Sequence, residues 1–286
     1  MSEITPAPTV TALTIAGSDS SGGAGLQADL RAFNALDIHG ASVVTLVTAQ
    51  GTRGVRRVDP LRPELVRAQL DAIFDDLSVA AIKTGALGNA AVVEIVADAL
   101  RSRKGVPLVL DPVINPTVGR TLLDDSGFAA FVRELLPQAT LVAPNREEAS
   151  RLAGRPLRTA AQARQACKAI AGLGAKSVLL KGGHFTGQES VDLLYDRGEF
   201  VELRAARVEV PPLHGLGCTL SALIAGLLAR GEPLRAAVAR AHAVLHHAIE
   251  RPRRVGEGLA LPGNLRMAVQ ATAAPDARAG TGGEGI

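Results

Sequence analysis

Residues 10–36 read VTALTIAGSDSSGGAGLQADLRAFNAL. The first seven residues are apolar and rich in β-branched side chains, which is typical of a buried parallel strand. Residues 17–25 hold four glycines, and Leu26, Leu30 and Phe33 then follow helical spacing. This segment therefore predicts a strand, a glycine-rich loop and a helix.

The glycine-rich loop has two interpretations. It lacks the G-x-G-x-x-G of dinucleotide-binding loops and the Gly-Lys-Ser/Thr ending of a P-loop. It is either a tight turn between strand and helix or a loop whose backbone approaches a small ligand. In the second case Asp19 or Asp29 would add a polar contact.

The same order of strand, loop and helix recurs along the chain. Further strands are expected over 41–48, 79–83, 107–110, 140–143, 177–180 and 207–210, with a hairpin over 191–195 and 200–203. Helices are expected over 62–77, 90–103, 128–136, 147–153, 160–173, 220–230 and 234–249. This alternation predicts a largely parallel sheet covered by helices on both faces.

Composition sets bounds on organisation and function. The chain has 286 residues, is 47% hydrophobic and 21% charged, and carries a net charge of +3. Its 26 arginines and 5 lysines are scattered, and it has one tyrosine and no tryptophan, so we expect no nucleic-acid partner. We expect one domain over 10–265, a loose arm over 1–9 and a disordered tail over 271–286.

The two cysteines and the N-terminal sequence give an expectation for the cellular compartment of the protein. Cys167 and Cys218 form no disulfide framework, and residues 1–6 lack the pattern of a signal peptide. No apolar run is long enough to span a membrane. We therefore expect a cytoplasmic protein with reduced thiols and no membrane contact; Cys167 itself is expected to be a small core residue.

The motif LHGLGCTLS at residues 213–221 precedes a long apolar helical pattern. A helix that begins here would direct unbonded N–H groups and the positive end of its dipole at an anion. The same field would bias the thiol of Cys218 toward thiolate. The motif predicts a phosphate site with a candidate base beside it.

Polar residues directly follow several predicted strands, where ligands bind in open α/β sheets. Gln50 is either a surface residue or a partner for the edge of a heterocycle, because its amide both donates and accepts. Asp111 either caps a turn or helps to hold Mg²⁺. Asn145 and Glu148 either cap a helix or lie near Mg²⁺ and its waters. Lys181 is either exposed or a partner of phosphate.

Three histidines on one predicted helix resemble a metal site in spacing only. His242 and His246 are four residues apart, and His247 follows. No third ligand and no general-base glutamate accompany them, so structural roles are expected.

Taken together, these motifs resemble the hydroxymethylpyrimidine/phosphomethylpyrimidine kinases of thiamine biosynthesis over residues 10–250. The matching segments, in order, are AGSDSSGGAGLQAD (16–29), VTAQ (47–50), LDPV (110–113), APNREEA (143–149), LKGGH (180–184) and HGLGCTLS (214–221). The resemblance implies a ribokinase-like fold, a three-layer α/β/α sandwich. It also implies that ATP and Mg²⁺ are used to phosphorylate 4-amino-5-hydroxymethyl-2-methylpyrimidine and then its monophosphate. We expect a homodimer.

The resemblance also implies roles for individual residues. Toward the pyrimidine, Gln50 would bind the ring edge, Asp29 would fix the ring, and Gly17 and Val113 would line the pocket. Around the transferred phosphate, the anion hole would comprise Gly215, Leu216, Gly217 and Cys218, with Cys218 as the candidate base. Magnesium and ATP phosphates would be organised by Asp111, Asn145, Glu148 and Lys181.

Three positions depart from the family pattern. Leu216 replaces a usual threonine, Ala86 replaces a usual methionine, and PTVGR at 116–120 lacks a usual lysine, although Arg120 retains a charge nearby. These departures are expected to affect the catalytic efficiency of the kinase and, above all, the second phosphorylation. They leave open a pyridoxal or pyridoxine kinase on the same scaffold, and a non-catalytic pyrimidine-binding relative.

Overall fold

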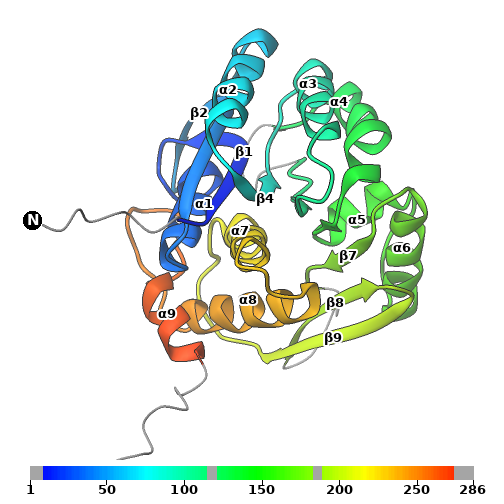
Figure 1. Ribbon diagram of the computed structural model, residues 1–286. Helices are drawn as coiled ribbons and strands as arrows, with labels where there is room; N and C mark the ends of the chain where they lie inside the picture. The colour runs from blue at the N-terminus through cyan, green and yellow to red at the C-terminus, as the bar shows by residue number, and fades with distance from the viewer. Residues whose placement is uncertain (1–8, 115–120, 183–188, 274–286) are drawn as a thin grey trace, which may run out of the picture.

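The computed structural model describes residues 9–114, 121–182 and 189–273 (Figure 1). The strands are β1 (Thr11–Asp19), β2 (His39–Gly51), β3 (Gly54–Pro60), β4 (Val79–Thr84), β5 (Leu108–Leu110), β6 (Leu141–Val142), β7 (Ser177–Leu180), β8 (Glu189–Asp196) and β9 (Glu199–Ala206). The helices are α1 (Gly25–Ala35), α2 (Pro63–Asp76), α3 (Ala90–Arg101), α4 (Asp125–Ala130), α5 (Arg146–Leu152), α6 (Ala160–Gly172), α7 (Leu216–Ala229), α8 (Leu234–Ile249) and α9 (Leu265–Thr272). After α4 the chain continues through a π turn (Phe131–Leu135) and a 3₁₀ turn (Leu136–Gln138).

All of these strands join one sheet in the order β3-β2-β1-β4-β5-β6-β7-β8-β9. The six strands from β2 to β7 are parallel, and β3, β8 and β9 are antiparallel at the two edges. The strand order reverses at β1, which lies between β2 and β4. In open α/β sheets a ligand crevice forms at such a switch point, beyond the carboxyl ends of the strands.

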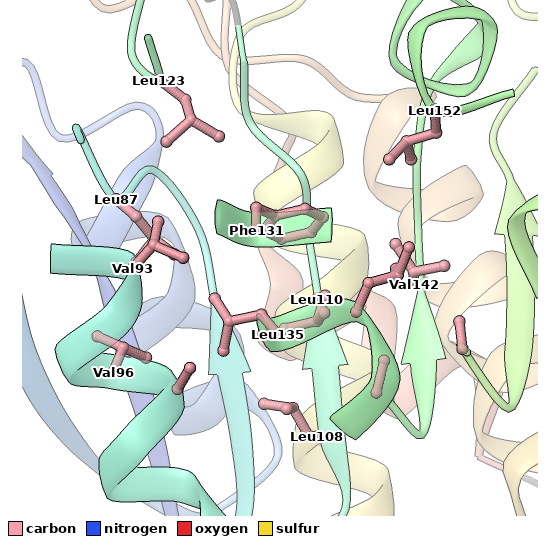
Figure 2. Close-up of a cluster of buried hydrophobic side chains, with 14 of the residues drawn as sticks. Leu87, Val93, Val96, Leu108, Leu110, Leu123, Phe131, Leu135, Val142 and Leu152 are labelled. Carbon is pink, nitrogen blue, oxygen red and sulfur yellow. The ribbon is translucent and has the colours of Figure 1, made fainter. Parts of the chain in front are cut away.

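Helices cover both faces of the sheet, so the predicted three-layer α/β/α architecture is confirmed. Helices α2 to α6 pack on one face, where Val93 and Val96 of α3 belong to the same buried cluster as Phe131, Leu135 and the strand residue Leu110 (Figure 2). Helices α1, α7, α8 and α9 cover the other face (Figure 1). Helix α7 is buried along nearly its whole length, as its uniformly apolar sequence requires.

Three elements differ from the expectations. Strand β3 was not predicted, because Arg56, Arg57 and Asp59 are exposed on this edge strand and leave little apolar alternation. Residues 207–210 form no strand; pairing resumes only as an isolated bridge between Leu213 and Ala260, after two prolines that have no N–H to donate. Helix α9 is not among the helices expected from the sequence, and its residues 271 and 272 fall within the range expected to be disordered.

The remaining terminal segments, residues 1–8 and 274–286, and the departure at 116–120 lie outside the described residues. Among the helices that the structure describes, none is both long and apolar enough to cross a membrane.

Candidate active site

A cavity of about 190 Å³ lies at the carboxyl ends of the parallel strands. Its wall includes the residues that follow β1, β4, β5, β6 and β7, together with the start of α7. The predicted site residues in this wall are Gly17, Gln50, Asp111, Val113, Asn145, Glu148, Lys181, Gly215, Leu216, Gly217 and Cys218. Segments from both ends of the chain therefore meet in one cavity.

Asp29 is not part of that wall. Its side chain is fully buried, and its Oδ2 accepts hydrogen bonds from the Thr14 hydroxyl at 2.6 Å and the Lys83 ammonium at 2.8 Å. Burial raises the pKa of Asp29, and the charge of Lys83 opposes that rise. The predicted contact between Asp29 and a substrate ring is therefore wrong, because the carboxylate belongs to a buried ion pair.

The start of α7 forms the centre of the cavity wall. Gly215 precedes the helix with a φ of 80°, and any Cβ at this position would overlap the carbonyl oxygen of Gly23. Only glycine fits this junction, which brings the loop after β1 against the start of α7. The first N–H groups of a helix lack partners within it, so residues 216–218 present donors suited to a phosphate.

The thiol of Cys218 lies in the same wall, partly exposed. Burial raises its pKa to about 12, although the nearby charge of Lys83 opposes this rise. The predicted bias toward thiolate is therefore wrong for the free protein, because desolvation of the thiol outweighs the favourable charges around it.

A cluster of charged groups forms one end of the cavity. The Lys181 ammonium lies 2.8 Å from Asp111 Oδ1, and the Ser221 hydroxyl donates to Asp111 Oδ2 at 3.2 Å. Burial by itself raises the pKa of Asp111, but Lys181 and then Lys83 outweigh it and hold that pKa below its usual value. Asp111 thus stays anionic, paired with Lys181.

Asn145 and Glu148 both cap a helix and line the cavity, so the two interpretations left open for them are compatible. The Asn145 side chain accepts from the backbone N–H of Glu148 at 2.9 Å, and the Glu148 carboxylate accepts from the backbone N–H of Asn145 at 2.7 Å. They form a capping box at the start of α5 and also line the cavity. Burial raises the pKa of Glu148 to about 7, against the opposing charge of Lys181.

Another part of the cavity lining is a hydrogen-bonding edge together with an apolar wall. The Gln50 amide nitrogen lies 2.9 Å from His214 Nε2, and His214 Nε2 lies 3.0 Å from Asp19 Oδ2. The apolar wall comprises Leu46, Ala86, Val113 and Leu122. Of these two groups, the sequence did not single out His214, Leu46 or Leu122; only the placement of His214 next to Gly215 hinted at a site role.

A second cavity of about 470 Å³ adjoins the first and shares Asn145, Lys181, Leu213, Leu216 and Gly217 with it. Its other lining residues are mainly apolar and come from the segment after β9 and from α7 and α8: Val208, Val210, Leu220, Leu245 and Ile249. His242 also lines it, with Nε2 3.9 Å from Asp192 Oδ2.

The remaining residues singled out from the sequence are the histidines of α8 and Cys167. No group of three or more His, Cys, Asp or Glu residues positioned to hold a metal occurs within the described segments. Cys167 lies on α6 and is fully buried in the core, as predicted.

Comparisons with known proteins place the chain among kinases. The family model described as phosphomethylpyrimidine kinase matches residues 19–263. A hydroxymethylpyrimidine/phosphomethylpyrimidine kinase of Rhizobium meliloti is 50% identical over 254 residues, which are 87% of this chain and 95% of that protein.

Two solved structures have the same fold. An ADP complex of Bacillus subtilis pyridoxal kinase superimposes with a TM-score of 0.85 at 33% identity, covering 91% of this chain and 99% of the other. A phosphomethylpyrimidine kinase of Clostridium difficile superimposes with a TM-score of 0.74 at 35% identity, covering 84% of this chain and 99% of the other. The family model over residues 19–263 and the sequence identity over most of the chain lead to one conclusion: the chain belongs to the phosphomethylpyrimidine kinase family.

Proposed function

We propose that this protein transfers the γ-phosphoryl group of ATP to the hydroxymethyl group of 4-amino-5-hydroxymethyl-2-methylpyrimidine. A second transfer, to the monophosphate, then gives the pyrophosphate used in thiamine biosynthesis. The observation that carries the proposal is that the α7 start lines both cavities, the first of which also contains Gln50, and that Lys181 lines both. Acceptor and donor substrates would meet there.

The pyrimidine is assigned to the first cavity. Gln50 both donates and accepts hydrogen bonds, which suits a ring that carries an amino group beside a ring nitrogen. Leu46, Ala86, Val113 and Leu122 offer apolar contacts to the faces of the ring and its methyl group. A cavity of about 190 Å³ suits a small single ring.

ATP is assigned to the second cavity and to the junction between the two. The apolar residues after β9 and on α8 would enclose the adenine. Lys181 and the N–H groups at the start of α7 would bind the phosphates, where charge neutralisation contributes most of the catalysis of phosphoryl transfer.

In the transfer step the substrate hydroxyl oxygen forms a bond to the γ-phosphorus, and the bond from that phosphorus to the β,γ-bridging oxygen breaks, releasing ADP. The hydroxyl proton passes to Cys218, which must be anionic to accept it. Backbone N–H groups of residues 216–218 stabilise charge on the transferring phosphoryl oxygens.

Magnesium fits the donor set at the charged end. Carboxylate and amide oxygens suit Mg²⁺, which usually keeps several waters. Asp111 and Glu148 each keep acceptor capacity beyond the contacts to Lys181, Ser221 and Asn145, so they would hold the ion or its waters. When bound, the ion neutralises charge on the β- and γ-phosphates.

A pyridoxine-type alcohol is a second candidate substrate, since Ala86 leaves the apolar wall wider than a methionine would. The family resemblance further supports a homodimer in the cytoplasm. Light scattering coupled to gel filtration tests the dimer.

The test of function uses purified protein with ATP, Mg²⁺ and either the hydroxymethylpyrimidine, its monophosphate or pyridoxine. ADP release and product masses are followed together. We expect ADP and both phosphorylated pyrimidines, with kcat/KM for the pyrimidine above that for pyridoxine. ATP binding without ADP release from any acceptor would contradict the proposal and indicate a non-catalytic relative.

A further inference from the structure

Lys83 on β4 is a fully buried lysine that the catalytic scheme above does not use. Neither its side chain nor that of its partner Asp29 has any exposed surface. Burying an ammonium is costly even when it is paired, and an apolar pair often serves stability as well or better. Burial of this ion pair is therefore weak evidence for a stabilising role, and a role at the adjoining cavity is considered instead.

The ammonium lies directly behind the cavity wall. A Cβ on Gly85, which lines the cavity, would lie 2.9 Å from Lys83 Nζ. Because alternate residues of a strand share a face, Lys83 is directed to the same side as Gly85, toward the start of α7. The absence of a side chain at residue 85 leaves room for the charge beside the cavity.

The charges around Cys218 come from four elements. Lys83 on β4 and Lys181 after β7 are positive, and Asp111 after β5 and Asp29 on α1 are negative. Among these groups Lys83 has the largest influence on the thiol, and it favours the anionic form. Asp29 holds Lys83 in place, and its attraction keeps the ammonium protonated, with a raised pKa, despite complete burial.

We propose that Lys83 is a positioning residue of the phosphoryl-transfer site, whose ammonium, held by Asp29 behind Gly85, stabilises the anionic form of Cys218. The residue touches no substrate; it acts through the charge that it presents to the thiol. The catalytic role of Lys83 rests on the proposed function, because it requires that Cys218 act as the base in phosphoryl transfer. The electrostatic effect on Cys218 itself is measurable without any turnover.

The test follows alkylation of Cys218 by iodoacetamide in the free protein at pH 9, with the Cys218 peptide quantified by mass spectrometry. Below the thiol pKa the rate tracks the thiolate fraction. The double variant Lys83→Met/Asp29→Asn removes both charges while nearly conserving volume. We expect its alkylation to be about ten-fold slower than wild type, as a pKa rise of one unit implies, with a parallel fall in kcat and KM for ATP within about two-fold.

Two further variants separate charge from packing. Thr14→Val removes a hydrogen bond to Asp29 without changing any charge, and its alkylation rate should stay within two-fold of wild type. Asp29→Asn removes the partner that holds the Lys83 ammonium and keeps it protonated, so it should slow alkylation. If the double variant does not fold, Asp29→Asn decides: slower alkylation supports the proposal, and an unchanged or faster rate overturns it.

A folded double variant that is alkylated at the wild-type rate would also overturn the proposal. Slower alkylation in a protein that releases no ADP would instead leave the role of Lys83 standing and refute the proposed kinase function.

Discussion

His214 Nε2 lies 3.0 Å from Asp19 Oδ2, although 195 residues separate the two in the chain. Asp19 also accepts backbone N–H groups from Gly23 at 3.0 Å and Ala24 at 2.8 Å, so its carboxylate organises the glycine-rich loop. Burial raises the pKa of Asp19, but the hydrogen bonds from His214 and Ser21 outweigh it and leave that pKa below its usual value. The pair locks the first loop of the fold against the start of α7.

Replacing Gln50 with alanine should weaken pyrimidine binding more than ATP binding. The side chain lines the first cavity but not the second, and losing its hydrogen bonds should raise KM for the pyrimidine about ten-fold. Initial-rate kinetics with each substrate varied in turn measure this. Gln165→Ala on the exposed face of α6 is the matched control, and equal losses for both substrates would contradict the placement of Gln50.

Replacing Cys218 with alanine should lower kcat by about 100-fold or more, because a positioned base contributes that much to proton transfer. KM for ATP should change little, since the backbone N–H groups of the anion hole remain. Steady-state kinetics test this, with Cys167→Ala as control: that variant deletes the fully buried core thiol and should lose stability but keep kcat. An unchanged kcat in Cys218→Ala would remove the base from the mechanism.

Glu148→Gln should stabilise the free protein at alkaline pH. The folded-state pKa of Glu148 is about 7 against an ordinary 4.5. The folded chain therefore holds this proton more tightly than the unfolded chain, and the free energy of unfolding falls as pH rises from 4.5 to 7. Glutamine avoids that loss and preserves the capping hydrogen bond.

Thermal unfolding at pH 8 and pH 5 measures the effect of Glu148→Gln. Tm should rise by roughly 3 °C or more at pH 8, and the difference from wild type should vanish at pH 5. The same variant should raise the magnesium concentration needed for half-maximal activity. A Tm difference equal at both pH values would contradict the raised pKa.

Gly215→Ala should be far more damaging than Gly231→Ala. Both glycines have positive φ, 80° and 82°, so each substitution costs about 1 kcal/mol of backbone strain. Only at Gly215 does the new Cβ also overlap the carbonyl of Gly23, whereas nothing lies within 4 Å at Gly231. We expect a larger fall in Tm and a raised KM for ATP in Gly215→Ala alone; equal Tm losses would refute the close approach.

Leu216→Thr should improve the second phosphorylation. A hydroxyl at the start of α7 adds a donor toward a charged phosphate, which is worth about ten-fold in kcat/KM for the monophosphate. Leu216→Val has similar shape without the hydroxyl and should give no gain. If valine helps as much as threonine, cavity size at this position, and not hydrogen bonding, limits the second step.

The alternation of strands and helices, the polar residues after the strands and a helix start within residues 213–221 were all predictable from the sequence, although α7 begins four residues before the expected range of 220–230. Each is a local property: periodicity sets the element, and loop chemistry sets its ends. Edge strand β3 was missed because its charged side chains face solvent and mask the local pattern.

Only the tertiary structure decided that Asp29 pairs with Lys83, that His214 joins Gln50 to Asp19, and that the Cys218 thiol is neutral in the free protein. These facts depend on which segments distant in the chain cover a given side chain. Desolvation and pairing act on the folded surface as a whole, so no local pattern of residues carries them.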